Sequence, residues 1–219
     1  MVKKISRLLT ALTLLGIVLM ASGLLQGGAQ SQQEKLKDTE ITAELLQRKT
    51  MQEIAQERDV EFLSHPEIAE FSDLSSLARS SQLIVYGKIV KAESAFTESG
   101  QHIETTYSVD IHRVLKSDPR LELPLTFTEL GGTVYTNGHK ATEKVEAFDA
   151  LKPDKNYLLF FEWSPNSKGY ILGGGMSAVF RVKGNARVYS LATSKGSPLR
   201  ENYNGTGLRE FIDQVLTLQ

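Results

Sequence analysis

The sequence predicts a mainly β protein, β with flanking helices, in which a small antiparallel barrel or sandwich lies between a charged N-terminal helix and an amphipathic C-terminal helix. Three observations predict this fold. Residues 83–90, 103–115 and 157–163 have the apolar patterns of strands, turn residues separate them, and residues 208–216 carry the apolar spacing of a helix. A five- or six-stranded, partly open barrel fits this number of strands, and a two-layer α+β sandwich is the alternative.

Residues 1–29 have the three parts of a secretory signal peptide. A basic start is followed by an apolar run over residues 8–25, and Gly27 and Ala29 are small residues before a cleavage site. The basic residues are Lys3, Lys4 and Arg7. The leader predicts an extracytoplasmic protein, periplasmic or secreted. The alternative is an uncleaved leader that holds a structural envelope protein at the membrane, because the apolar run is near the short end of a membrane span.

The cysteine count and the net charge limit which binding partners and which kinds of functional site the protein can have. The 219-residue chain has no cysteine and a formal net charge of −1. The absence of cysteine excludes disulfides, thiolate metal sites and a Cys nucleophile, and it favours a bacterial envelope over a eukaryotic secretory route. Because the leader is basic, the rest of the chain is more acidic than the whole. We therefore predict no nucleic-acid partner, and contact with a membrane only through an uncleaved leader.

Residues 30–70 are predicted to form a charged helical or spacer segment before a barrel domain over residues 71–219. Good helix formers occupy residues 34–37 and 43–58, but their apolar stripe is broken. We expect a solvated helix that His65-Pro66 ends, and an amphipathic helix that binds a partner is the alternative.

The first half of the barrel domain alternates strands and turns. Ser72 is the expected N-cap of a short helix that ends near Ser80. After the strand 83–90 and a turn at 98–101, residues 103–115 alternate apolar and polar side chains, as in a half-buried strand. Leu123, Leu125 and Phe127 repeat this alternation, and a loop is expected from Gly131 to Val145.

The second half begins with residues 157–163, whose apolar side chains fall on both faces and predict a central strand. A short strand follows at 170–172, then a bulge or barrel corner at Gly173–Gly175. Residues 177–182 and 186–191 predict a hairpin. The last helix is expected to begin after Thr206 and to bury an apolar face formed by Leu208, Phe211, Ile212, Val215 and Leu216.

Five segments occur in an order that resembles an uncharacterised family of secreted bacterial β-barrel domains. They are SSQLIVYGKIV (80–90), HRVLKS (112–117), LGG (130–132), KNYLLFFEW (155–163) and GGGMSAVFRV (173–182). The pattern is also similar, at the level of fold alone, to the netrin/TIMP-like OB barrel, and it implies an OB-like barrel here. Ser117 and Asn156 replace glycines of the bacterial pattern, and the disulfides of the netrin/TIMP-like proteins have no counterpart. The resemblance implies no catalytic residue, and a shared fold does not carry a function.

The polar face of the strand 103–115 supplies weak candidates for metal ligands. His102 and Glu104 form one pair and Asp110 and His112 another, because side chains two apart share a face. The pairs lie about 26 Å apart along an extended strand, and zinc needs three or four ligands at one point. His139, from the loop, is the candidate third ligand of one pair. We interpret these residues as a solvated strand face and predict neither metal nor cofactor.

Aromatic side chains supply the candidate ligand-binding residues. They are Trp163, Tyr170, Tyr135 and Tyr157. Packing in the core is the ordinary role of alternating aromatic residues in a strand, and stacking on a sugar or peptide is the alternative.

The sequence contains no recognisable catalytic set. Residues 175–179 read Gly-Met-Ser-Ala-Val and lack the final glycine of a nucleophile elbow, and Gly173–Gly175 lack the lysine of a phosphate-binding loop. We therefore predict a non-enzymatic binding or accessory protein of the bacterial envelope, with an envelope protein or a glycan as partner. One alternative is a metal-dependent or hydrolytic extracytoplasmic enzyme, and another is a membrane-anchored structural protein.

Overall fold

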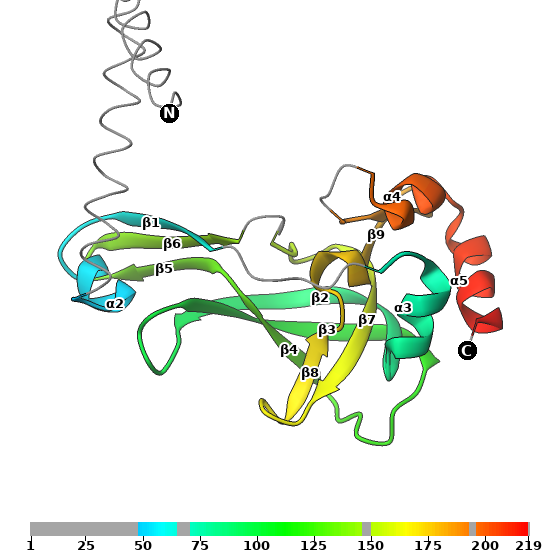
Figure 1. Cartoon of the computed structure of the whole chain (residues 1–219), viewed down its shortest axis with the longest axis horizontal. Coiled ribbons are helices and arrows are strands. Elements are labelled where there is room, and N and C mark those ends of the chain that lie inside the picture. Colours follow the sequence, from blue (N-terminus) through cyan, green and yellow to red (C-terminus); the bar gives the residue numbers. More distant parts are fainter. Residues whose placement is uncertain (1–47, 65–70, 146–149, 193–195, 219) are drawn as a thin grey trace, which may run out of the picture. The chain divides into compact units, whose positions relative to one another are not determined.

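The computed structural model describes residues 48–64, 71–145, 150–192 and 196–218. The chain divides into two compact units, Met1–Lys49 and Thr50–Gln219, and the second unit contains all the helices and strands labelled in Figure 1. The leader and most of the segment 30–49 lie outside the described residues, as do the predictions made for them. Within the described part of the chain, no helix is both long enough and apolar enough to cross a membrane.

Five strands of the second unit close into a small barrel (Figure 1). They are β2 (Leu83–Phe96), β3 (Ile103–Lys116), β4 (Leu125–Leu130), β7 (Asn156–Ser164) and β8 (Gly169–Leu172). Their order around the ring is β2-β3-β4-β8-β7, and β7 pairs with β2 again. All neighbours are antiparallel except β4 and β8, which meet through the single parallel pair Phe127 and Tyr170. The mainly β prediction is confirmed. The single pair between β4 and β8, which we call the seam, closes the barrel.

A hairpin extends the sheet beyond the ring. β9 (Val179–Lys183) pairs with β7, and β10 (Arg187–Ser190) pairs with β9 across the predicted turn. The predicted strand start at Ser177 is wrong, because Gly175–Ala178 form the 3-10 helix η1. The Ser177 hydroxyl donates to the Gly174 carbonyl at 2.5 Å, and a Cβ at Gly174 would lie 2.6 Å from the Phe71 ring. The glycines therefore form a turn into η1 between β8 and β9, where a bulge or barrel corner was expected, and β9 begins only after η1.

A second sheet of three strands replaces the loop expected over residues 131–145. β5 (Gly132–Thr136) and β6 (His139–Val145) form an antiparallel hairpin, and β1 (Val60–Ser64) pairs in parallel with β6. Asn137 and Gly138, at the tip, both have positive φ (50° and 84°), as a two-residue hairpin turn requires. The loop prediction is wrong because it left this Asn-Gly turn signal unused.

The segment before the barrel is shorter as a helix than predicted. The helix α2 covers Met51–Ala55, and Thr50 and Glu53 form a capping box at its start. Its buried residues are Met51, Ile54 and Ala55, and it contacts β6. The prediction of a solvated helix does not hold for this part, since one face packs within the unit and β1 follows where a spacer was expected.

The core has two layers because β7 buries both of its faces. Inside the barrel, the Phe127 ring lies 5.2 Å from Tyr107 and 5.0 Å from Phe161, measured between centroids. On the outer face of β7, the Phe180 ring lies 5.7 Å from Phe160 and 4.7 Å from Phe211. Residues 157–161 are accordingly all buried, which confirms the prediction of a central strand.

Three short helices flank the β sheets. They are α3 (Leu74–Ser80), α4 (Pro198–Tyr203) and α5 (Leu208–Thr217). Asp73, not Ser72, caps α3, because its carboxylate accepts the Ser76 amide at 2.7 Å while the Ser72 hydroxyl donates to that same carboxylate. The residue before α5 is Gly207 rather than the expected Thr206, and α5 buries Phe211, Ile212 and Val215. The predicted amphipathic helix therefore docks, in contact with α3, β3 and β10.

The docking of α5 predicts the effect of a charge on its buried face. Phe211 is fully buried. Phe211→Asp should lower the protein's free energy of unfolding by about 4 kcal/mol, because an unpaired carboxylate would enter the core. Leu216→Asp is the matched control on the same helix, since Leu216 is 39% exposed. Urea denaturation of the two variants measures the difference, and equal midpoints would show that α5 does not dock.

Candidate functional site

A buried carboxylate connects three separate segments near the start of β3. The Glu143 side chain, on β6, has no exposed surface. One of its oxygens accepts the Ile103 backbone N–H at 2.6 Å. The other accepts the Ser64 hydroxyl of β1 and lies 3.0 Å from His102 Nδ1. Glu143 thus satisfies the requirement that a buried carboxylate be hydrogen-bonded.

Two glycines bring β6 into this position. Gly131 and Gly132 have φ values of 96° and 144°, which only glycine adopts readily. The Gly131 N–H donates to the Ile103 carbonyl at 2.7 Å, and its own carbonyl accepts the Thr105 hydroxyl at 2.6 Å. A Cβ at Gly132 would collide with the Ser94 and Thr105 hydroxyls. After β4 the chain therefore runs along the hairpin of β2 and β3 as β5. It then turns back as β6, which places Glu143 beside Ile103.

His102 is the chemically available member of this cluster. Its side chain is 50% exposed, whereas that of Glu143 is fully buried. A carboxylate can only accept hydrogen bonds, so His102 Nδ1–H donates to Glu143, and Nε2 lies outside this contact. An imidazole held in this way can accept a proton or bind a ligand through Nε2. His102 was predictable from its residue type, whereas Ser64 and Glu143 were not, and the signal for Glu143 is a glutamate at an inward position between Ala141 and Val145.

The other candidate metal ligands lie in separate places. His112 Nε2 lies 3.2 Å from Asn156 Oδ1, and His139 Nδ1 lies 3.4 Å from Asp59 Oδ1. Glu104 and Asp110 are exposed on β3. Within residues 48–64, 71–145, 150–192 and 196–218, no three His, Asp or Glu side chains converge where they could hold a metal ion.

The candidate ligand-binding aromatic residues divide into buried and exposed ones. Tyr157 and Tyr170 are 2% and 5% exposed, which leaves their rings no surface for stacking. Trp163 is half-buried, edge-on to Tyr170 at 5.3 Å, with the Arg120 guanidinium 5.1 Å from its ring centroid. Tyr135, on β5, is 72% exposed. Of the four, Tyr135 presents the largest free ring.

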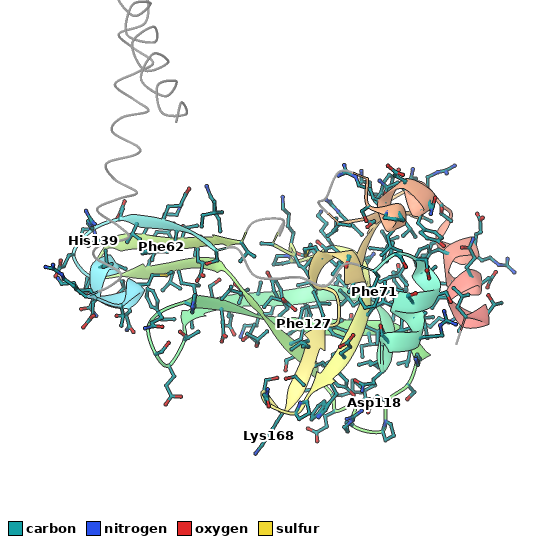
Figure 2. The ribbon with its side chains drawn as sticks, in the orientation of Figure 1. Phe62, Phe71, Asp118, Phe127, His139 and Lys168 are labelled. Carbon is teal, nitrogen blue, oxygen red and sulfur yellow. The ribbon has the colours of Figure 1, made fainter. Side chains whose placement is uncertain are left out.

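The buried carboxylate of Asp118 and the exposed guanidinium of Arg120 form a second polar contact that the sequence did not reveal. Arg120 donates its backbone N–H and Nε to Asp118 Oδ1 at 2.8 Å, and Nη2 to Oδ2 at 2.6 Å. These bonds hold the pKa of the Asp118 carboxyl below its ordinary value. In Figure 2, Asp118 and Lys168 lie near the hairpin of β7 and β8, whereas Phe62 and His139 lie in the three-stranded sheet. The pair fixes the connection from β3 to β4 and holds Arg120 over Trp163.

The three-stranded sheet presents one polar face with two large exposed hydrophobic side chains, Leu63 and Tyr135. We call it the outer face, and it comprises Glu61, Leu63, Thr133, Tyr135, Lys140, Thr142 and Lys144. Leu63 is 58% exposed, and Lys144 Nζ lies 2.6 Å from Glu61 Oε1. The opposite face of the same strands carries Phe62, Ala141 and Glu143, all buried. The sheet is therefore fixed from one side and free, among the described residues, on the other.

Glu129 on β4 carries a further carboxyl; the residue is half-buried and lies on the same strand face as the buried Leu125 and Phe127. It accepts the Leu172 N–H of β8 at 3.1 Å. Burial raises its pKa to about 7, because the charged form loses hydration that the hydrogen bond from Leu172 offsets only in part. Burial also raises the pKa of the neighbouring Tyr107 hydroxyl to about 12.

Comparisons with known proteins add no family to this description. The chain matches no protein-family model, and no curated protein matches it either.

The bonds of Glu143 predict a large effect of a small substitution. Glu143→Gln should lower the free energy of unfolding by about 3 kcal/mol. The NH2 group of the glutamine would replace one carboxylate oxygen and face donors that need an acceptor. Glu61→Gln, which changes an exposed carboxylate on the neighbouring strand, should change stability little. Chemical denaturation of both variants tests this difference, and equal losses would mean that Glu143 has no special role.

Glu129 predicts a dependence of stability on pH. An acid whose pKa is raised on folding holds its proton more tightly in the folded state than in the unfolded state. The free energy of unfolding should therefore fall between about pH 4.5 and pH 7, by about 3 kcal/mol from this group, and stay low above that range. Glu129→Gln should remove this fall, which makes the variant more stable than the wild type at pH 8. Thermal unfolding across this pH range measures the effect, and parallel profiles of the two proteins would contradict it.

Proposed function

We propose that this chain is an exported, non-enzymatic binding or accessory protein of the bacterial envelope, which contacts its partner through the outer face of the three-stranded sheet. The observation that carries the proposal is Tyr135, exposed over 72% of its surface on a sheet whose other face is fixed by buried contacts. The partner class is an envelope protein or a glycan. We propose no nucleic-acid partner.

The physical argument rests on the amount of apolar surface that the outer face leaves in water. Tyr135 and Leu63 are among the most exposed large hydrophobic side chains of the described residues. Tyrosine buries a large area on binding at a low cost in side-chain entropy, and its hydroxyl can still reach a polar partner. Thr133, Thr142 and Lys140 on the same face supply hydrogen-bond groups around the ring.

Export is supported by the sequence of residues 1–29, and the absence of cysteine favours a bacterial envelope over a eukaryotic secretory route. The five sequence segments whose order resembles that of secreted bacterial β-barrel domains also support export. In this proposal the protein is periplasmic or secreted after cleavage near Ala29, and it works without a cofactor.

Site-specific cross-linking in the native envelope tests the outer face. A photoreactive amino acid at position 135 should give a discrete adduct. The control is position 123, where Leu123 is 75% exposed in the connection between β3 and β4, and the same group there should give none. The adducted partner is then purified, and Tyr135→Ala should weaken its binding to the full chain by about tenfold or more. Equal adducts at both positions, or binding that Tyr135→Ala leaves unchanged, would refute this face as the contact surface. The mass of the exported chain reports in the same experiment whether it begins near Gln30 or at Met1.

The geometry of His102 favours a second candidate function, a hydrolytic enzyme. The buried Glu143 orients the imidazole, and Nε2 is available as a general base. Hydrolysis of an ester, peptide or glycoside substrate by the purified protein, lost in His102→Gln while the fold is retained, would support this candidate. It would also refute the non-enzymatic proposal.

A further inference from the structure

The ring of the barrel is closed unequally at its last strand. β8 pairs with β7 over four residue pairs, from Phe161 and Leu172 to Ser164 and Gly169. It pairs with β4 only through Phe127 and Tyr170. β8 is also four residues long, with Gly169 at its start and Gly173 directly after its end. If the ring opens, it therefore opens between β4 and β8, and β8 stays with β7.

Glu129 supplies a side-chain link across this seam. It lies two residues after Phe127 on β4, and it accepts the N–H of Leu172, two residues after Tyr170 on β8. Within the residues that the structure describes, no lysine, arginine or histidine bonds its carboxyl group. The charged form of Glu129 is thus held inside the barrel by one backbone donor, and it would regain hydration if β8 moved away.

The groups around Glu129 do not titrate in its place. From β3, Thr105 pairs with it and the Tyr107 hydroxyl faces it, and from β8 Tyr170 lies on the same seam. Burial raises the pKa of Tyr107 and of Tyr170 to about 12, so both stay neutral near pH 7. Asp118, near Tyr170, is ionised throughout this range because Arg120 holds its pKa low.

Glu162 is the nearest comparable acid. It lies on β7, paired with Ile171 of β8, and burial raises its pKa as well. A Cβ at Gly173 would lie 2.6 Å from its Oε1 atom. Ile171 and Leu172 are successive residues of β8, so their side chains point to opposite faces, and Glu162 therefore lies on the outer side of β8. It offers a matched control, since it is a partly buried carboxyl beside β8 that does not join β8 to β4.

We propose that the seam between β4 and β8 is a proton-controlled closure of the barrel. The seam stays shut while Glu129 is protonated, and it loosens when the carboxyl ionises, because the open form lets water solvate the charge. This inference does not depend on the partner proposed above.

Amide hydrogen exchange of the full chain between pH 5 and pH 8 tests the closure. After correction for the intrinsic rate, protection of the β4 and β8 amides, that of Leu172 included, should fall by about tenfold or more over this range. These amides should also exchange at a lower opening free energy than those between β2 and β7. Glu129→Gln, which mimics the protonated side chain in shape and charge, should abolish the fall, and Glu162→Gln should retain it.

Three results would overturn the closure. One is an equal fall in wild type and Glu129→Gln, and another is a fall that Glu162→Gln abolishes. The third is seam amides that exchange only together with those between β2 and β7, because this would mean that Glu129 titrates in global unfolding alone. Thermal unfolding of each variant at pH 5 establishes that it is folded before exchange is compared.

Discussion

The fold depends on one strand that has no solvent-facing side. β7 pairs with β2 along one edge and with both β8 and β9 along the other. Its inward residues contact the aromatic stack of the barrel, and Phe160 contacts the layer that Phe180 and Phe211 complete. A single strand can join two cores only when both of its faces are apolar, and the unbroken run Tyr157–Phe161 satisfies this condition. The position of the terminal helix α5 follows from the same run, because Phe211 docks on the layer that β7 supports.

The three-stranded sheet depends on a different kind of contact. Its inner face contributes few large apolar residues, and the carboxylate of Glu143 makes the specific bonds to Ile103 and Ser64. Hydrogen bonds to a buried charge are directional, so they fix the register of β6 against the start of β3 more tightly than apolar contacts alone would. The contact surface proposed for the outer face gains from these bonds, because Tyr135 lies on strands whose opposite side they hold in place.

The sequence predicted those elements whose stability is local or whose pattern is strong. The alternation over residues 103–115, the apolar run at 157–163 and the spacing around Phe211 each specify an element without reference to a partner. β1 could not be predicted in this way, because Val60–Ser64 follows a helix-rich stretch and becomes a strand only by pairing with β6, about 80 residues away. The site shows the same limit. His102 was identifiable as a residue type, but Glu143 and Ser64 become its neighbours only through the turn at Gly131-Gly132, and no spacing in the sequence records that approach.

Glu143, which is buried, and Glu129, which is half-buried, show how hydrogen-bond donors decide the role of a carboxyl group. Glu143 receives hydrogen bonds from a backbone amide and a hydroxyl and lies beside an imidazole, so its charge is compensated where it lies. Among the described residues, Glu129 receives a hydrogen bond from the Leu172 N–H alone, and burial raises its pKa to about 7. A compensated carboxylate resists separation from its donors, because separation leaves both sides unsatisfied. An ionised carboxylate with few donors favours separation, because water replaces the few hydrogen bonds that are lost and hydrates the rest of the charged group. The first therefore fits the contact surface proposed for the outer face, and the second fits the closure proposed for the seam between β4 and β8. The two properties can coexist in one small protein because the seam lies on β8, which pairs with none of the strands of the three-stranded sheet.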